Sequence, residues 1–476
     1  MTRRLLALSL LLALAACVRN PLTGKRQFSL VSTQEEIAIG QQASKDVQQS
    51  IGLLPNPRVQ EYVARVGKAL AAKSERPDLP WSFQVLDDPT VNAFALPGGP
   101  IFITRGIFTH MSSEAELAAV LGHEIGHVTA RHSADQITRT QLAQLGLGLG
   151  SVLSPNLAKY GELASAGLGL MLLKYGRNAE TQSDELGLRY MLDAGYDVRE
   201  MEDLFRMLSR TQASQGDRLP TWLSTHPDPG DRLKATQQRL AALNVNPATL
   251  RTEEASYLRL LQGMAYGENP RQGFFQGGHF FHPELRFQLD FPEGWKTANQ
   301  TQAVLAVSPK QDALMALAVA GTVPPEQALR QFFSQQGVQQ LPVATAGLPP
   351  QASYFEARTE QGVIHGLTAF FSHGGTTYQL LGYTAAAQLA AYDPAFRASF
   401  TSFRELNDPA MLAVQPARIE LVTLPQAMTL AQFHAGSPST IPLEELAILN
   451  GVTSGETLPA GHTVKRVLGG ELPRPR

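Results

Sequence analysis

The sequence predicts an α+β protein with a mainly helical first half that contains a small sheet, followed by an α/β domain and a small C-terminal module. Apolar residues recur at helical spacing over most of residues 33–262. Further along the chain, apolar and polar residues alternate, as in Leu285–Phe291, which is typical of half-buried strands. The composition changes again near Pro409, and a chain of 476 residues agrees with about three domains.

The composition excludes several classes of function. The chain has 40 basic and 42 acidic residues, whereas nucleic-acid binding needs a basic surplus, so no nucleic-acid partner is expected. Hydrophobic residues make up 43% of the chain, which is enough for a sizeable core. The single cysteine, Cys17, excludes an internal disulfide and a cysteine-based metal cluster.

The first residues have the pattern of a targeting segment. Two arginines precede an apolar run, Leu5–Ala16, which is shorter than the roughly 20 residues needed to cross a bilayer and fits a secretory signal peptide over residues 1–16. The sequence Leu14-Ala15-Ala16-Cys17 resembles the bacterial lipobox, which implies lipidation of Cys17. Val18, in place of an aspartate, resembles the sorting pattern of outer-membrane lipoproteins. A plain signal peptide and an uncleaved anchor are the alternatives.

Helix and strand patterns can be placed along the first half. Thr33 and Glu36 form a capping box that begins a helical stretch over 33–73. Ser113 can cap a long helix over 112–131. The expected strands cover 81–86 and 101–104, and the later helices cover 178–194, 199–213 and 229–243.

A stretch rich in glycine, alanine and leucine, residues 140–173, lies between these helices. Pro155 divides it into two apolar pieces, each too short to span a bilayer, so a helical hairpin is expected. A flap over a cleft, a membrane-touching surface and ordinary core packing all fit this stretch.

The strongest functional pattern is His123-Glu124-Ile125-Gly126-His127. Residues four apart on a helix are offset by about 40° around the axis and about 6 Å along it, so both imidazoles can reach one metal ion. Glu124 then points at a water molecule beside the metal. The surrounding helix is apolar, and histidines on a buried helix need polar partners, which favours a metal site over a pair of exposed histidines.

A third ligand is expected further along the chain. The metzincin pattern is absent, because Ala130 and Ser133 stand where that pattern has a glycine and a histidine. His132 lies about 140° around the helix from the second histidine of the pattern, which makes it a poor ligand. Glu180 and Asp184 share one helix face, so Glu180 can bind the metal while Asp184 hydrogen-bonds a ligand histidine.

Four motifs occur in an order that is similar to a known family. They are Val91–Gly99, His123–His127, Glu180–Asp184 and Leu223–Pro227. This order resembles the gluzincin metallopeptidases that include HtpX, BepA and the CAAX prenyl proteases, over roughly residues 30–245.

The resemblance implies roles for individual residues. One zinc ion per chain would be bound by His123, His127 and Glu180, with Glu124 as the catalytic base and Asp184 bonded to a ligand histidine. The substrate cleft would be lined by Asn92, Ala93, Phe94 and Ala95. Relatives often have a second glutamate where this chain has Gln182, a departure that is expected to matter little.

Such a site would hydrolyse peptide bonds. The metal supplies an activated water, and Glu124 takes its proton and passes it to the leaving amine. The developing oxyanion needs a further donor, for which His226 is the candidate. In related lipoproteins the matching histidine instead occupies the fourth zinc position and keeps the enzyme latent. Both roles stay open for His226, as does that of a surface histidine. Arg232 could support the site or cap local structure, and it is left unassigned.

The remaining domains are assigned from weaker patterns. Residues 263–283 contain five glycines and four phenylalanines and are expected to link the first domain, 17–262, to an α/β domain, 284–408. The sequence of Leu289–Trp295 resembles the opening strand and turn of PsbP-like domains. Residues 409–476 resemble a degenerate LysM module, which implies contact with peptidoglycan; an accessory module without glycan affinity is the alternative.

The leading hypothesis is a lipid-anchored zinc metalloendopeptidase on the periplasmic face of the bacterial outer membrane. Its polypeptide substrates would be misfolded or misassembled envelope proteins. The second hypothesis is an envelope assembly factor or scaffold lipoprotein in which the metal site is latent. The third is a structural lipoprotein that binds peptidoglycan.

Overall fold

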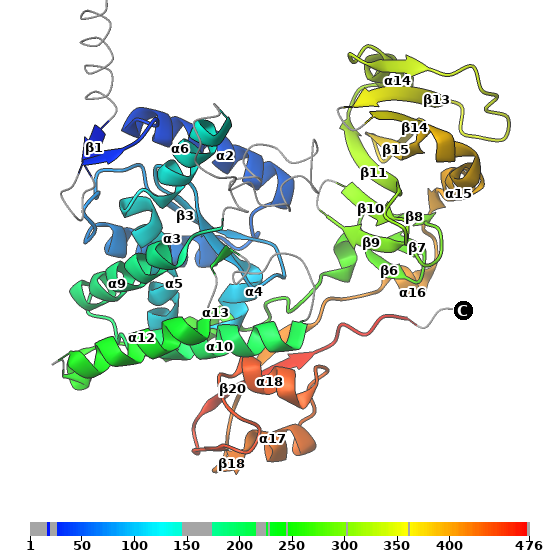
Figure 1. The fold of residues 1–476 in the computed structure, drawn as a ribbon. Helices are drawn as coiled ribbons and strands as arrows, with labels where there is room; N and C mark the ends of the chain where they lie inside the picture. Colours follow the sequence, from blue (N-terminus) through cyan, green and yellow to red (C-terminus); the bar gives the residue numbers. More distant parts are fainter. Residues whose placement is uncertain are drawn as a thin grey trace, which may run out of the picture. The chain divides into compact units, whose positions relative to one another are not determined.

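The computed structural model describes residues 17–19, 26–144, 174–215, 225–226, 229–243, 246–300, 303–359 and 362–473. The chain divides into two compact units, the first formed by 1–267 with 418–468 and the second by 268–417 with 469–476 (Figure 1). The signal peptide expected over 1–16 and most of the hairpin expected over 140–173 lie outside the described residues.

The first unit is mainly helical and contains a small sheet, as the sequence predicts. Its elements from the first part of the chain are β1 (Cys17–Arg19), β2 (Arg26–Phe28), α2 (Thr33–Ile51), α3 (Pro57–Ala71), β3 (Ser82–Leu86), β4 (Ala93–Ala95), β5 (Pro100–Thr104), α4 (Arg105–His110), α5 (Glu114–Thr129), α6 (His132–Gln144), α9 (Arg177–Asp193), α10 (Glu200–Gln215), α12 (Pro229–Ala242) and α13 (Glu254–Leu261). Those from the last part are β17 (Arg418–Thr423), β18 (Met428–Thr429), α17 (Leu430–Gly436), α18 (Leu443–Leu449), β19 (Thr457–Leu458) and β20 (Thr463–Leu468).

The first helical stretch differs from the sequence prediction in two ways. It is two helices, α2 and α3, because the chain turns at Gly52 with a φ of 87° and Pro57 starts a new helix. The capping box is formed by Ser32 and Glu35, one residue earlier than predicted. Glu36 is instead buried, and its carboxylate bonds the guanidinium groups of Arg76 and Arg131.

The small sheet has the strand order β3-β5-β4, so β4 is an edge strand. β3 and β5 are parallel, and β4 runs antiparallel to β5 with Phe94 opposite Phe102. The rings of Phe94 and Phe102 stack at 5.4 Å and join a core that includes Val47 of α2.

Helices α5 and α9 pack closely because small residues face each other. A methyl group at Gly187 of α9 would lie 2.9 Å from the backbone nitrogen of His123, and one at Gly122 would lie 3.1 Å from the Cα of Gly187. Gly126 faces Ser183 in the same way. This contact brings the histidine motif of α5 beside the acidic motif of α9.

The segment 418–468 packs within the first unit, whereas the sequence predicts a separate module over 409–476. Strand β17 pairs with β20, and the helices α17 and α18 lie between these two strands in the sequence. Lys465 of β20 is only 1% exposed, and its ammonium donates hydrogen bonds of 3.0 to 3.3 Å to the carbonyls of Thr109, His110 and Met111. These carbonyls lie at the end of α4, where a helix leaves its acceptors unpaired, so Lys465 caps the helix that directly precedes α5.

The second unit contains two antiparallel sheets. Their strand orders are β12-β13-β14-β15-β11-β10-β9 and β16-β8-β7-β6. The elements are β6 (Phe274–Gln276), β7 (His279–His282), β8 (Phe287–Asp290), β9 (Lys296–Asn299), β10 (Ala303–Val307), β11 (Ala313–Gly321), α14 (Pro325–Phe333), β12 (Val338–Gln340), β13 (Ala352–Thr359), β14 (Gly362–His373), β15 (Thr376–Ala385), α15 (Leu389–Ser402), β16 (Arg404–Glu405) and α16 (Pro409–Leu412).

Helices α14 and α15 of the second unit cover opposite faces of its larger sheet. Phe396 of α15 joins a core with Tyr354, whereas Phe332 of α14 contacts Phe355, the next residue of β13. Successive strand residues point to opposite faces, so both faces are covered. Residues 263–283, expected to be a linker, contain β6 and β7, because their phenylalanines pair across the two strands.

Among the helices of the described residues, none combines the length and the apolar character that a membrane span requires.

The buried His110 is expected to make stability depend on pH. Burial, the largest cause, and the Lys465 ammonium lower the pKa of His110 to about 4, against the opposing effect of its bond to the Gly106 carbonyl. An unfolded histidine titrates near 6.5, so between pH 6.5 and 4 the unfolded chain binds more protons. The stability is therefore complete above pH 6.5 and falls by roughly 3 kcal/mol as the pH drops through this window.

The measurement is the difference in free energy of unfolding between the wild type and His110→Gln across this pH range. Lys465 faces His110 and Glu116 faces Lys465, and their own titrations contribute to both proteins alike. A difference that stays constant from pH 6.5 to 4 would contradict the prediction.

Candidate active site

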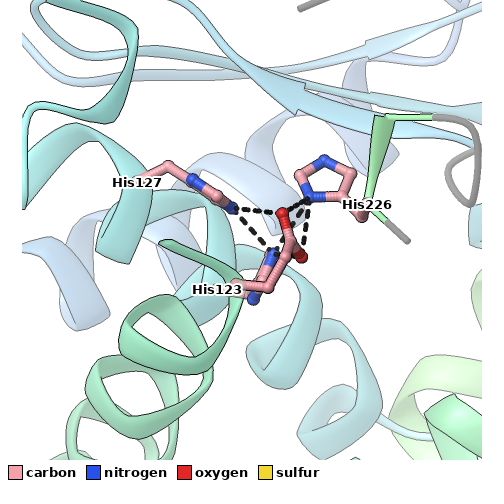
Figure 2. Close-up of side chains that lie close together, drawn as sticks. His123, His127 and His226 are labelled. Carbon is pink, nitrogen blue, oxygen red and sulfur yellow. Dashed lines mark hydrogen bonds and ion pairs between the residues drawn. The ribbon is translucent and has the colours of Figure 1, made fainter. Parts of the chain in front are cut away.

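Three elements of the first unit bring the candidate residues together. Helix α5 presents His123, Glu124 and His127, and α9 presents Glu180 on the facing surface, one helical turn before Asp184. His226 lies shortly before α12 and points into the same cluster (Figure 2). The side chains of the three histidines and two glutamates are at most 2% exposed.

The donor atoms have the spacing of a tetrahedral metal site. His123 Nε2 lies 3.0 Å from His127 Nε2 and 3.2 Å from His226 Nδ1. Oxygens of Glu180 lie 3.1 Å from His226 Nδ1, 3.5 Å from His123 Nε2 and 3.6 Å from His127 Nε2. Ligands about 2.0–2.1 Å from a tetrahedral centre are separated by about 3.3–3.4 Å, so the four groups fit a single small cation.

The charges around the cluster also fit a divalent cation. Three carboxylates, those of Glu124, Glu180 and Asp184, are buried there with one guanidinium, that of Arg232. With neutral imidazoles these groups leave a surplus of negative charge, and buried charge needs a compensating partner or a metal. Imidazole and carboxylate ligands in a tetrahedral arrangement are typical of zinc.

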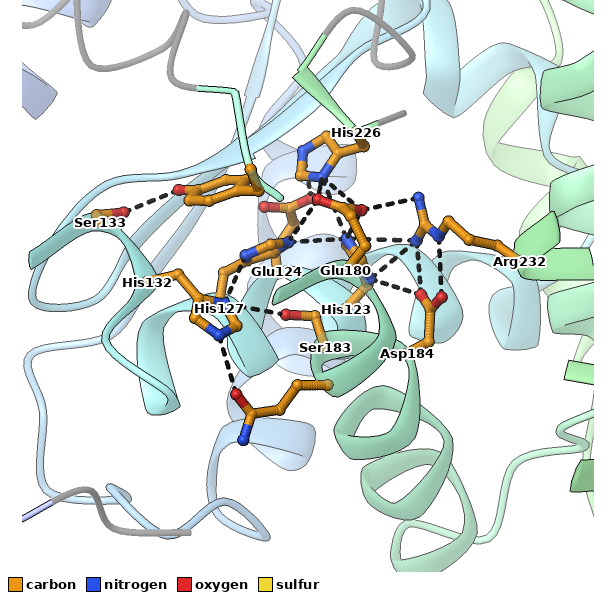
Figure 3. A network of polar contacts seen from close by, with 12 residues as sticks. His123, Glu124, His127, His132, Ser133, Glu180, Ser183, Asp184, His226 and Arg232 are labelled. Atoms are coloured by element: carbon orange, nitrogen blue, oxygen red, sulfur yellow. Dashed lines mark hydrogen bonds and ion pairs between the residues drawn. The ribbon is translucent and has the colours of Figure 1, made fainter. Parts of the chain in front are cut away.

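Asp184 fixes the ring of His123. The Nδ1–H of His123 donates to Asp184 Oδ1 at 2.9 Å, because a carboxylate only accepts, and this leaves Nε2 unprotonated towards the cluster (Figure 3). Arg232 donates to both oxygens of Asp184 and lies 3.0 Å from Glu180. Its guanidinium also sits over the ring of Phe205 at 4.6 Å.

The electrostatics keep both α9 carboxylates ionised. Burial raises the pKa of Asp184, but Arg232 and the His123 bond outweigh it and lower the pKa well below its ordinary value. Burial likewise raises the pKa of Glu180, and the neighbouring His226 and Arg232 reverse the shift. Burial and the neighbouring imidazoles lower the pKa of His127, which favours the neutral form that a metal requires.

His226 faces both Glu180 and Glu124, the expected catalytic base. Its Nδ1 faces Glu180, and its Nε2 lies 3.6 Å from Glu124 Oε1. Burial lowers the pKa of His226, but the charges of Glu180 and Glu124 outweigh burial and raise it. His226 is therefore a fourth donor of the cluster in this structure, and it is not a surface residue.

Two further residues that contact the cluster, Tyr175 and Arg232, have no role assigned from the sequence. Tyr175 stacks on the ring of His127 at 4.0 Å, and its backbone N–H donates to the Thr225 carbonyl beside His226. Arg232 follows a proline-containing stretch of the sequence. The position of Arg232 in the sequence does not indicate that it contacts α9, because only the tertiary fold brings the two together.

The other predicted residues lie outside the ligand cluster. Asn92 is buried at the start of the edge strand β4, and its backbone N–H donates to Thr104 Oγ1 at 3.1 Å. Ala93, Phe94 and Ala95 form β4 itself, next to α5. Cys17 begins β1, which pairs with β2; its lipidation stays a prediction.

Residues 57–240 match the model of the family described as Peptidase family M48. The mitochondrial metalloendopeptidase OMA1 of Schizosaccharomyces pombe is 35% identical over 239 residues, which cover 48% of this chain and 68% of that protein. The beta-barrel assembly-enhancing protease of Escherichia coli K12 is 28% identical over 247 residues, which cover 50% of each chain. Apart from the first of these, the chain spans about half or less of the length of the curated relatives it matches.

Two solved structures are similar to part of the chain. The cyanobacterial PsbP of Synechocystis covers 27% of this chain and 91% of its own, at 16% identity and a TM-score of 0.22. LpqN of Mycobacterium tuberculosis covers 28% and 87%, at 11% identity and a TM-score of 0.19. Neither likeness bears on function, and the PsbP-like and LysM-like assignments stay predictions.

Proposed function

The chain belongs to peptidase family M48, as the motif order suggested, and from this premise we propose that it is a zinc-dependent endopeptidase whose active site is the cluster described above. The observation that supports the proposal best is the spacing of the four buried donor groups, which matches one tetrahedral cation. His123, His127 and Glu180 would be the permanent ligands.

The metal would supply a polarised water at neutral pH. Glu124 would take the proton from that water and deliver it to the leaving amine, since its carboxylate lies beside the cluster, 3.6 Å from His226 Nε2, and is fully buried. Asp184 would hold His123 in the tautomer that binds metal, and Arg232 would hold Asp184 through two hydrogen bonds.

The edge strand β4 offers a way to bind an extended substrate. Its partner β5 occupies one side only, so a peptide can add to the sheet through backbone hydrogen bonds. The resemblance assigns the substrate cleft to the same segment, residues 92–95. Recognition through backbone groups suits unfolded polypeptides, because folded proteins have few free extended segments.

His226 supports a latent resting state. A fourth protein donor occupies the position that water or substrate needs in a catalytic site, where zinc ordinarily keeps one place open. Activity would then require His226 to leave the cluster. The same geometry favours the second hypothesis, an assembly factor or scaffold with a latent metal site, and an active-site variant that still complements a deletion strain would support that role.

We further propose a lipid anchor at Cys17 and a location on the periplasmic face of the outer membrane, where misfolded or misassembled envelope proteins would be the substrates. The lipobox-like sequence before Cys17 supports the anchor. Bacterial relatives named beta-barrel assembly-enhancing proteases agree with such substrates. Contact of residues 409–476 with peptidoglycan is a separate proposal that rests on the LysM resemblance.

The metal site is tested by metal analysis of the purified protein. We expect one zinc ion per chain, cleavage of casein that a chelator abolishes and zinc restores, and loss of both zinc and cleavage in Glu180→Ala, which removes a ligand. Glu185→Ala is the matched control, because Glu185 lies on the same helix with a half-exposed side chain that bonds Arg239 instead. Wild-type protein without stoichiometric metal, or Glu180→Ala that keeps its zinc, would contradict the proposal.

A further inference from the structure

We propose that His132 and Gln182 are positioning residues that fix the tautomer and the orientation of the metal ligand His127. His132 lies on the side of the cluster opposite Asp184 (Figure 3). Its contacts with His127 and Gln182 connect α5, α6 and α9. This inference rests on the proposed metal site and assigns residues that the proposed function does not use.

The chain brings His132 back towards His127 by interrupting the helix. In a continuous helix the two side chains would point about 140° apart. Helix α5 ends at Thr129, however, and Arg131 has a φ of 62°, so α6 starts in a new direction at His132. Arg131 is held in this conformation by bonds to Glu36 and to the Val31 carbonyl.

The resulting hydrogen bonds run in one direction, from His127 to His132 and from His132 to Gln182, and these three residues are called the relay. Nδ1 of His132 lies 2.9 Å from Nδ1 of His127, and Nε2 of His132 lies 3.0 Å from Oε1 of Gln182. The amide oxygen of Gln182 only accepts, so Nε2 of His132 carries the proton and Nδ1 of the neutral ring is free of one. That Nδ1 accepts from the Nδ1–H of His127, and the hydroxyl of Ser183 at 3.4 Å can donate to the same atom.

This direction is the one that metal binding requires. With its proton on Nδ1, His127 presents an unprotonated Nε2 to the cluster, 3.0 Å from Nε2 of His123. The reverse direction would put the proton of His127 on Nε2, between the ring and the metal. Gln182 therefore determines, through His132, which nitrogen of His127 is available.

The relay complements the stacking of Tyr175. The Tyr175 ring lies 4.0 Å from that of His127 at an interplanar angle of 26°, which restricts the plane of the imidazole. His132 then determines which edge of the ring points inward. His123 is oriented in a similar way by Asp184, so each of these two ligand histidines has its own partner on the outside of the cluster.

The inference is tested by metal affinity, measured by competition with a chromophoric chelator on the full chain. His132→Phe keeps a ring but removes the acceptor, and we expect it to weaken zinc binding by about 10- to 100-fold. Gln182→Met is expected to weaken it less, and Gln182→Glu, which keeps an acceptor oxygen, to restore wild-type affinity. In the Co²⁺-substituted protein, His132→Phe is expected to change the visible ligand-field spectrum.

His110→Phe is the matched control, because it removes another buried histidine of the same unit outside the cluster. It should leave zinc affinity and the Co²⁺ spectrum unchanged. If wild-type protein binds no zinc, the proposed metal site fails. If wild type and His132→Phe bind zinc equally with identical Co²⁺ spectra, or if both phenylalanine variants lose affinity equally, the relay fails while the site stands. Should His132→Phe not fold, Gln182→Met and Gln182→Glu decide the question, because equal zinc affinity in these two would overturn the relay.

Discussion

Glu124→Gln is expected to lower kcat/KM for an unfolded substrate such as casein by about 100- to 10,000-fold, the usual contribution of a general base. Glutamine has the same shape as glutamate but cannot take a proton from the attacking water. The donor groups of His123, His127 and Glu180 are untouched, so the metal content should stay at the wild-type value. The measurement is steady-state proteolysis together with metal analysis of the same preparation.

Glu116→Gln is the matched control for this variant. Glu116 is buried on the same helix, and burial, the largest cause, raises the pKa of its carboxyl and so disfavours the charged form that glutamine lacks. Its side chain bonds the backbone of Ser112 and takes no part in the cluster. Cleavage that survives in Glu124→Gln at the wild-type rate would show that another group is the base.

His226→Ala is expected to raise basal proteolysis by about tenfold or more. The imidazole fills the fourth donor position, and a resting state that is favoured by about 1.4 kcal/mol reduces the competent fraction tenfold. Removing the side chain opens that position to water and substrate. The measurement is the initial rate of casein cleavage by purified protein, at equal metal content.

A fall in the rate would instead assign His226 to stabilisation of the oxyanion, the alternative that the sequence left open. The two roles also differ in zinc affinity, because only a ligand contributes to it in the resting state. Thr225→Val is a suitable control, since it alters the neighbouring side chain while keeping the backbone carbonyl that accepts from Tyr175.

Much of the cluster follows from local sequence. A helix places residues four apart on one face whatever surrounds it, so His123 with His127 and Glu180 with Asp184 can be paired without knowledge of the fold. The meeting of the two helices depends on tertiary contact. Gly122, Gly126 and Gly187 allow it, and their role is visible only once α5 faces α9.

The contacts on the outer side of His127 depend on backbone geometry that periodicity does not encode. A continuous helix would direct His132 away from His127, and the positive φ of Arg131 reverses that direction. The exclusion of His132 as a ligand agrees with the cluster, but its contact with His127 does not follow from the sequence. Gln182 stands where relatives often have a glutamate, a difference expected to matter little. Its amide oxygen lies in hydrogen-bond contact with Nε2 of His132.

The division of the chain into its two units could also not be predicted from local sequence patterns. Alternating residues predicted strands in the second half, and the structure contains them. The association of 418–468 with the first unit depends on long-range contacts such as those of Lys465. The sequence around Lys465 does not indicate that its ammonium caps the end of α4.

Because the first unit is assembled from residues 1–267 and 418–468, its completion depends on the order of synthesis. Residues up to 267 leave the ribosome first, and Lys465 follows after about 200 more residues, which takes roughly 10–40 s at 5–20 residues per second. Throughout this interval the last carbonyls of α4 lack the ammonium that caps them. Helix α4, which directly precedes α5, therefore acquires its cap only after residues 268–417 of the second unit have been synthesised.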